Sequence, residues 1–195
     1  MDFAGRTGFV GRMIGAARFE RETYRQIADD DTATVQAVGV VVLGALAGGI
    51  SVALSVSISG GEAGGFATGL IIATLRVLLG WITWSGVTWF VGTRVMHSTA
   101  TFGEVARSLG FAQSPALLGI FGFVPGLGLL VLLTASLWGL ATGFYAIRET
   151  LRLETRDTIV TVIVGFIAYT IIVVMIAGGL VAELLASGAG AGATL

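Results

Sequence analysis

The 195-residue chain is 55% apolar and only 12% charged, with a net charge of −1. Soluble domains carry about 25% charged residues, so this composition excludes an ordinary soluble domain and indicates a protein solvated largely by lipid. The lack of cysteine excludes disulfides and thiol chemistry, and the opening residues lack the apolar core of a signal peptide, so we expect no cleavable leader.

Residues 1–31 are expected to form a cytoplasmic amphipathic segment. Within residues 3–27, apolar side chains such as Phe3, Met13 and Tyr24 recur on one side of a helix, and arginines surround them. Arg6 and Arg21 interrupt the apolar stripe. This pattern predicts a helix lying on the membrane surface.

Uncharged runs predict a transmembrane domain over residues 32–183. At about 20 residues per crossing the runs accommodate five spans, and Pro125 with neighbouring glycines supplies the turn between the third and fourth. The expected helices cover about residues 34–58, 66–93, 108–124, 127–147 and 158–182, and residues 184–195 form a flexible tail. The predicted fold is an all-α integral membrane protein with short amphipathic interfacial helices.

Five spans would place ten of the eleven arginines on the same side of the membrane. The positive-inside rule then predicts a cytoplasmic N-terminus and an external C-terminus. Beyond the N-terminal segment, the predicted cytoplasmic basic surface consists of Arg94, Arg107, Arg148, Arg152 and Arg156. The last three form a stripe if their helix continues past the fourth span. Such a surface favours anionic headgroups or an acidic partner, although topology setting alone accounts for it equally well.

The third predicted span has an unusual start. Thr101 and Glu104 have the spacing of a capping box, which predicts a short amphipathic helix before the span. Pro115 removes a backbone donor, so we expect a kink there, with Gln113 and Ser114 near the freed carbonyls.

Arg76 interrupts the apolar run of the second span. The 18 residues from Arg76 to Arg94 would cover about 27 Å of helix, so Arg76 can reach the outer headgroups as a structural, interfacial residue. This is the preferred interpretation. The alternative is an intramembrane ion pair with Glu183, or failing that with Glu62.

Small residues recur at four-residue spacing in two spans. Gly44 and Gly48 form one such pattern, and Gly139 and Gly143 form another. Such patterns let transmembrane helices approach closely. Packing within one chain is the preferred interpretation, and a seam for self-association is the alternative.

The motifs of intramembrane enzymes are missing. The only histidine is His97, and the sequence has no GxSxG, HExxH or P-loop. We therefore expect no enzymatic activity, no metal and no cofactor.

Two stretches resemble the YIP (Ypt-interacting protein) domain family. "ARFERETYRQIADDDTATVQAVGVVVLGAL" is similar to its acidic run and first span, and "ATFGEVARSLGFAQSPALLG" with "VPGLG" is similar to its middle. The resemblance implies five helices and a cytoplasmic N-terminus. Eukaryotic members bind prenylated Rab-type GTPases and one another, and act in vesicle traffic. Only about 30 residues precede the first span here, and all basic residues are arginine, which suggests a prokaryotic member and gives no basis for GTPase binding.

The sequence therefore leads to a non-catalytic scaffold or adaptor that organises protein partners or lipids at the cytoplasmic face of the plasma membrane. Expected partners are anionic headgroups and a membrane protein or a second copy of the chain, and no nucleic acid. The alternative is a small-solute, ion or lipid transporter that works as an oligomer, with Arg76 and the kinked third span in its pathway.

Overall fold

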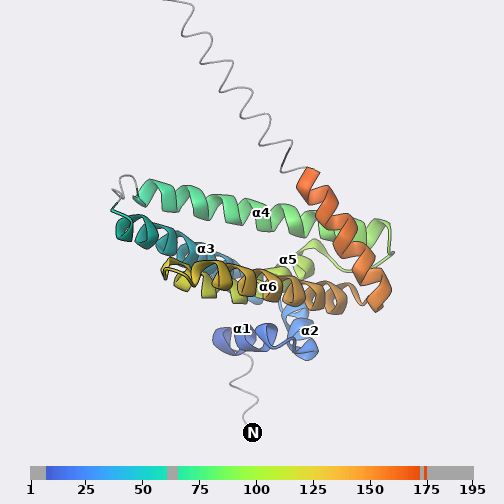
Figure 1. Cartoon of the computed structure of the whole chain (residues 1–195). Helices are drawn as coiled ribbons and strands as arrows, with labels where there is room; N and C mark the ends of the chain where they lie inside the picture. The colour runs from blue at the N-terminus through green and yellow to red at the C-terminus, as the bar shows by residue number, and fades with distance from the viewer. Residues whose placement is uncertain (1–7, 61–65, 172–173, 175–195) are drawn as a thin grey trace, which may run out of the picture.

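The computed structural model describes residues 8–60, 66–171 and 174, and this part of the chain is helical without any strand (Figure 1). The helices are α1 (Phe9–Ala17), α2 (Arg21–Asp29), α3 (Ala33–Ile58), α4 (Phe66–Arg94), α5 (Phe102–Ala112), the 3-10 helix η1 (Ser114–Phe123) and α6 (Gly128–Leu151). A further helix covers residues 155–171.

Three of the described helices are long and apolar enough to cross a membrane, namely Ala33–Ile58, Gly69–Arg94 and Gly128–Leu151. Large apolar side chains on α4 and α6 point outward, as expected for surfaces that face lipid: Leu79 is 64% exposed and Leu137 is 67% exposed. The all-helical membrane class is thus confirmed. Five crossings and the orientation of the termini stay predictions.

Residues 108–124 do not form one helix. Their first part is the end of α5, and the remainder is the ten-residue 3-10 helix η1, which packs mainly against α3 and α6. Neither segment reaches the length of a spanning helix on its own. The predicted last span, residues 158–182, lies partly outside the described residues, as do the tail and the first seven residues.

The N-terminal segment forms two helices where the sequence predicts one. The break falls at Phe19, which has a φ of 62°, and the backbone N–H groups of Phe19 and Glu20 donate to carbonyls of the last turn of α1. Gly15 permits the tight hairpin, because a Cβ at this position would lie 2.4 Å from the Thr23 hydroxyl oxygen. The left-handed residue and the close approach end α1 and fold α2 back.

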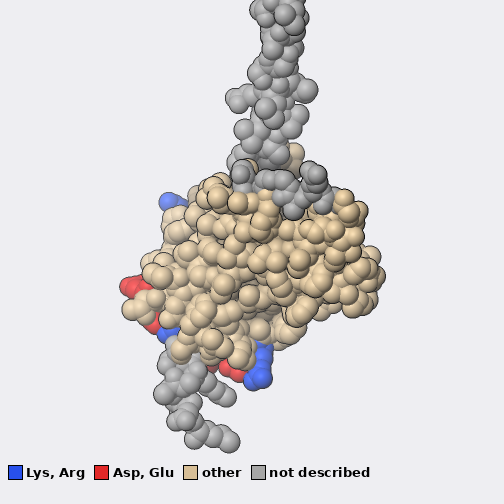
Figure 2. Space-filling model, turned by 90° about the vertical axis from the view of Figure 1, so that its left-hand side faces the viewer, with Lys and Arg blue, Asp and Glu red and all other residues tan. Residues whose placement is uncertain are grey.

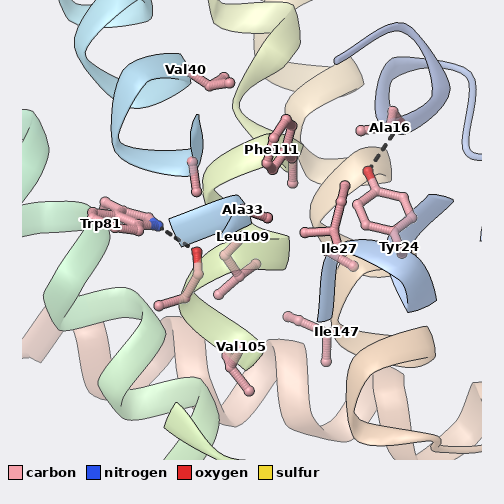
Figure 3. Packing of buried hydrophobic residues seen from close by; sticks show 14 of the residues in the cluster. Ala16, Tyr24, Ile27, Ala33, Val40, Trp81, Val105, Leu109, Phe111 and Ile147 are labelled. Atoms are coloured by element: carbon pink, nitrogen blue, oxygen red, sulfur yellow. Dashed lines mark hydrogen bonds between the residues drawn. The ribbon is translucent and has the colours of Figure 1, made fainter. Parts of the chain in front are cut away.

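Helices α1, α2 and α5 pack with residues 142–151 of α6 into one unit, here called the headpiece (Figure 1). Its core includes Ile27, Phe111 and Ile147, all almost fully buried (Figure 3). The Tyr24 hydroxyl donates to the Ala16 carbonyl oxygen at 3.0 Å, and burial raises the pKa of Tyr24. Burial of these apolar side chains is the main stabilising contribution to the headpiece.

Helix α5 begins with the predicted capping box, which is confirmed. The Glu104 backbone N–H donates to the Thr101 hydroxyl, and the Thr101 N–H donates to the Glu104 carboxylate. However, α5 is not a surface helix, since every residue from 105 to 112 is buried against α3, α4, α6 or α2. At Gly110 a Cβ would lie 2.8 Å from the Ala37 Cβ, so α3 and α5 are in backbone contact there.

Candidate functional site

The headpiece contains a cavity of about 790 Å³. It lies where α2, residues 96–100 and the end of α6 meet. Small-molecule sites typically measure about 300–1,000 Å³. The basic side chains of the lining are Arg21, Arg25, Arg148 and Arg152, and the acidic ones are Asp29, Glu104 and Glu149.

Glu149 joins α6 to α2 at this cavity. Its side chain is only 5% exposed, and its carboxylate lies 2.7 Å from Arg25 Nη2 and 3.5 Å from Arg21 Nε. The two arginines are more than half exposed, so their charges remain hydrated while the carboxylate is buried. One buried acid thus holds two basic residues of α2. The local sequence does not predict these ion pairs, because its one signal is an acid that directly follows Arg148 after a long uncharged run.

Residues 96–100, which follow α4, are held against the same end of α6. The Ser98 hydroxyl donates to the Leu151 carbonyl oxygen at 3.0 Å, and the Trp89 indole N–H donates to the Ala100 carbonyl oxygen at 3.1 Å. These bonds satisfy backbone carbonyls that the helix end and the connection would otherwise leave unpaired. The cavity wall is therefore built from fixed segments.

Arg107 does not contribute to an exposed basic surface, contrary to the sequence-based expectation. Its side chain is 8% exposed, and it donates to the Asp31 carboxylate at 2.7 Å and to the Ala28 carbonyl oxygen at 2.6 Å. The reason is the docking of α2 on α5, which places the end of α2 over this guanidinium.

Arg148, Arg152 and Arg156 do not form the stripe expected if their helix continued past the fourth span. Helix α6 ends at Leu151, and Arg152 adopts the left-handed conformation with a φ of 54°. The Leu153 N–H then donates to the Arg148 carbonyl oxygen at 3.1 Å, which closes the helix end. Arg156 consequently lies on the next helix. Arg94, Arg152 and Arg156 are exposed, and Arg148 is half-buried.

Another ion pair ties α1 to the end of α2. The Arg12 guanidinium is buried, pairs with Asp30 and donates to the Gln36 side chain at 3.1 Å. Asp30 also accepts hydrogen bonds from the backbone and hydroxyl of Thr32. The Thr32 hydroxyl and Arg12 together lower the pKa of Asp30 to about 2. These contacts fix the position of α1 and α2 before α3 begins.

The residues of the predicted transport path lie on different elements. Arg76 is exposed on α4, which packs against α3 and α5. Gln113 ends α5, and Ser114 and Pro115 are buried at the start of η1, where the Ser114 hydroxyl donates to the Phe111 carbonyl oxygen. Glu183 and Glu62 lie outside the described residues, so the Arg76–Glu183 pair stays a prediction.

The predicted packing glycines differ in their surroundings. A Cβ at Gly44 would lie 3.2 Å from the Ala116 Cβ, and the backbone of Gly48 lies beside Gly119. At Gly139 and Gly143, no described atom outside the local helix lies within 4 Å of such a Cβ. Among these positions, Gly44 and Gly48 therefore face η1, whereas the Gly139–Gly143 side of α6 faces away from the rest of the described chain.

The cavity offers guanidinium groups, hydroxyls and one imidazole. His97 lines it in the left-handed conformation, with a φ of 56°. Among the described residues, no group of three or more histidine, aspartate or glutamate side chains is placed to hold a metal ion. This chemistry suits the binding of an anion.

Comparison with known proteins gives a family but no individual relative. No curated protein and no solved structure matches the chain. A family model described as the Yip1 domain matches residues 14–178, which includes most of the headpiece and all three candidate spanning helices. The chain therefore belongs to the Yip1 domain family of membrane proteins.

Proposed function

We propose that this protein is a non-catalytic scaffold that organises partners at the cytoplasmic face of a prokaryotic plasma membrane. The observation that carries the proposal is the headpiece itself. A shared apolar core, and ion pairs that each join one buried side chain to one exposed side chain, connect segments that precede, separate and end the candidate spanning helices. Such a unit presents a fixed charged surface next to the bilayer.

The distribution of charge supports the cytoplasmic assignment. Figure 2 shows the face where α3 ends and α4 and α6 begin, and its visible part carries charged side chains only near its margins. Arg94 and Arg148 lie in the last turns of α4 and α6, at the opposite ends of these helices, and Arg152 and Arg156 come shortly after α6. Under the positive-inside rule the arginine-rich end faces the cytoplasm, and with five spans the C-terminus would then be external.

Membership of the family supports the same role. Yip1 domain proteins are non-enzymatic membrane proteins that interact with other membrane proteins and with membranes. The partner proposed here is a membrane protein or a second copy of the chain, for which the open Gly139–Gly143 side of α6 provides a surface of small residues.

The test is affinity capture from native membranes in mild detergent, with mass spectrometry of the recovered proteins. The variant Arg94→Glu with Arg156→Glu reverses two exposed charges outside the cavity, and Arg76→Glu is the matched control on the remote part of α4. A stoichiometric partner that is lost only in the double variant supports the proposal. Capture of no partner, or equal recovery from all three proteins, contradicts it.

A second candidate function is transport, and the break between α5 and η1 favours it. Transporters bind substrates at discontinuous helices, and η1 begins with the buried Ser114 and Pro115. Flux of ions, small solutes and labelled lipid into reconstituted liposomes tests this alternative, with Arg76→Gln as the first variant. Liposomes that stay tight to all three would exclude it.

A further inference from the structure

We infer that the headpiece cavity binds an anionic ligand whose net negative charge is carried by a phosphate group, and that Arg148 and Arg152 recognise it. The inference rests on the proposed function, because a scaffold at headgroup depth brings phospholipid within reach. It concerns a different set of residues from the partner test, so either can fail alone.

The charged side chains that line the cavity favour an anionic ligand. Four arginines and three carboxylates line the cavity. Arg21 and Arg25 share the single carboxylate of Glu149. Arg148 and Arg152 form no ion pair with any other described residue, so their charges are available.

The other two acids of the lining, Glu104 and Asp29, repel a bound anion only weakly. The Glu104 carboxylate accepts the Thr101 backbone N–H at 2.8 Å as part of the capping box. Asp29 is exposed at the end of α2, where water and salt screen its effect on a ligand. The lining therefore retains an excess of positive charge, and the planar guanidinium group is suited to bind phosphate oxygens in pairs.

The cavity also lies beside the ends of two candidate spanning helices. Residues 96–100 directly follow the end of α4, and Leu151 is the last residue of α6. Both helices are candidate membrane spans, and the ends of spans lie near the lipid headgroups. The cavity also has apolar lining at Met96 and Leu153, which can contact the carbon skeleton of a headgroup. An anionic phospholipid and a soluble phosphate ester present the same group to this site.

The experiment uses the full chain in detergent and native mass spectrometry. The probes are phosphatidylglycerol and phosphatidylcholine, and sn-glycerol 1-phosphate is the soluble phosphate ester. The variants are Arg148→Gln with Arg152→Gln, and Arg152→Gln alone, because the exposed Arg152 tolerates replacement more readily than the half-buried Arg148. Arg94→Gln with Arg156→Gln is the matched control, since both residues are exposed and neither lines the cavity.

The wild type is expected to retain phosphatidylglycerol in preference to phosphatidylcholine. The cavity double variant should bind phosphatidylglycerol at least about tenfold more weakly, because each lost charge-assisted hydrogen bond weakens binding by about that factor or more. The affinity of the single variant for phosphatidylglycerol should lie between those of the wild type and the double variant. The affinity of the control variant should equal that of the wild type. Competition by sn-glycerol 1-phosphate would identify a site open to soluble phosphate esters as well, and its absence would identify the lipid as the ligand.

Two results would overturn the inference. One is equal binding of the two lipids by the wild type together with no binding of sn-glycerol 1-phosphate. The other is an equal loss of phosphatidylglycerol binding in the cavity variant and the control variant. That result would show diffuse attraction of the lipid to the arginine-rich end instead of binding at a site. If the double variant fails to fold, the single variant decides between these results.

Discussion

Replacing Arg21 and Arg25 with alanine is expected to destabilise the protein more than replacing their shared partner, Glu149, with glutamine. The reason is the unequal burial of the two sides of this ion pair. The Glu149 side chain is 5% exposed, whereas those of Arg21 and Arg25 are 54% and 57% exposed. Removal of the arginines leaves a buried carboxylate without a counter-charge, but removal of the carboxylate leaves two arginines that water already solvates.

The magnitudes follow from this asymmetry. Removing one side of a buried ion pair costs about 3–5 kcal/mol, and the partial exposure of the arginines places the double variant near the lower value, about 3 kcal/mol. Glu149→Gln keeps the volume and a hydrogen-bond acceptor and loses only the charge assistance, about 1 kcal/mol. The variant that combines all three replacements should resemble Glu149→Gln, because it contains no unpaired buried charge.

Thermal unfolding in detergent, followed by tryptophan fluorescence, measures these differences. About 1 kcal/mol corresponds to about 2–4 °C in the melting temperature for a domain of this size. The double variant should therefore melt about 6–12 °C below the wild type, and Glu149→Gln about 2–4 °C below it. If Glu149→Gln is as destabilising as the double variant, or if the combined variant is the least stable, the argument from buried charge is wrong.

Three further predictions use the same unfolding measurement. Gly110→Ala should lower the free energy of unfolding by about 1–3 kcal/mol through overpacking, because the new Cβ would lie 3.2 Å from the Ala37 carbonyl oxygen, which cannot move aside. Gly139→Ala is the control, because no described atom outside the local helix lies within 4 Å of a Cβ at that position. Asp30 has its pKa lowered from 3.8 to about 2, so it contributes stability that is present above about pH 4 and is lost toward pH 2, and Asp30→Asn should lose stability less steeply over that interval. Tyr24→Phe should cost about 1 kcal/mol, because it removes one of the two hydrogen bonds that the buried Ala16 carbonyl oxygen accepts and leaves the one from the Phe19 N–H, and hydrogen exchange in α1 should rise.

Each of these three predictions has a clear contrary result. Equal melting temperatures for Gly110→Ala and the wild type would show that α3 and α5 can separate without cost. Parallel stability curves for Asp30→Asn and the wild type between pH 4 and pH 2 would show that the carboxylate gains nothing from its hydrogen bonds. Unchanged exchange in α1 for Tyr24→Phe would show that the hydroxyl does not hold the hairpin.

Some features of this protein can be read from the sequence because they depend on neighbouring residues. The low charge and long apolar runs predict membrane helices, and three of the described helices meet that description. The capping box at Thr101 and Glu104 is set by a three-residue spacing, and the structure confirms it. The resemblance to the YIP domain also rests on local stretches, and the family match confirms it.

Other features depend on contacts between distant segments, which no local pattern records. The amphipathic pattern of α5 predicts an apolar face that lies on the bilayer or on the other spans, but α2, α3, α4 and α6 pack around the helix and bury Arg107 as well. Residues 148, 152 and 156 have the spacing of a helical stripe, yet the left-handed Arg152 ends the helix between them.

The candidate site also combines features set by the local sequence with features set by contacts between distant segments. Its arginines were visible in the sequence as members of the set predicted to lie on one side of the membrane, but the cavity exists only because α2 folds back onto the end of α6. Whether a charged residue is buried and paired, or exposed and available to a ligand, depends on which segments surround it. The sequence by itself determined the membrane class and the family. The tertiary structure decided which arginines hold the headpiece together and which have no ion pair with another described residue.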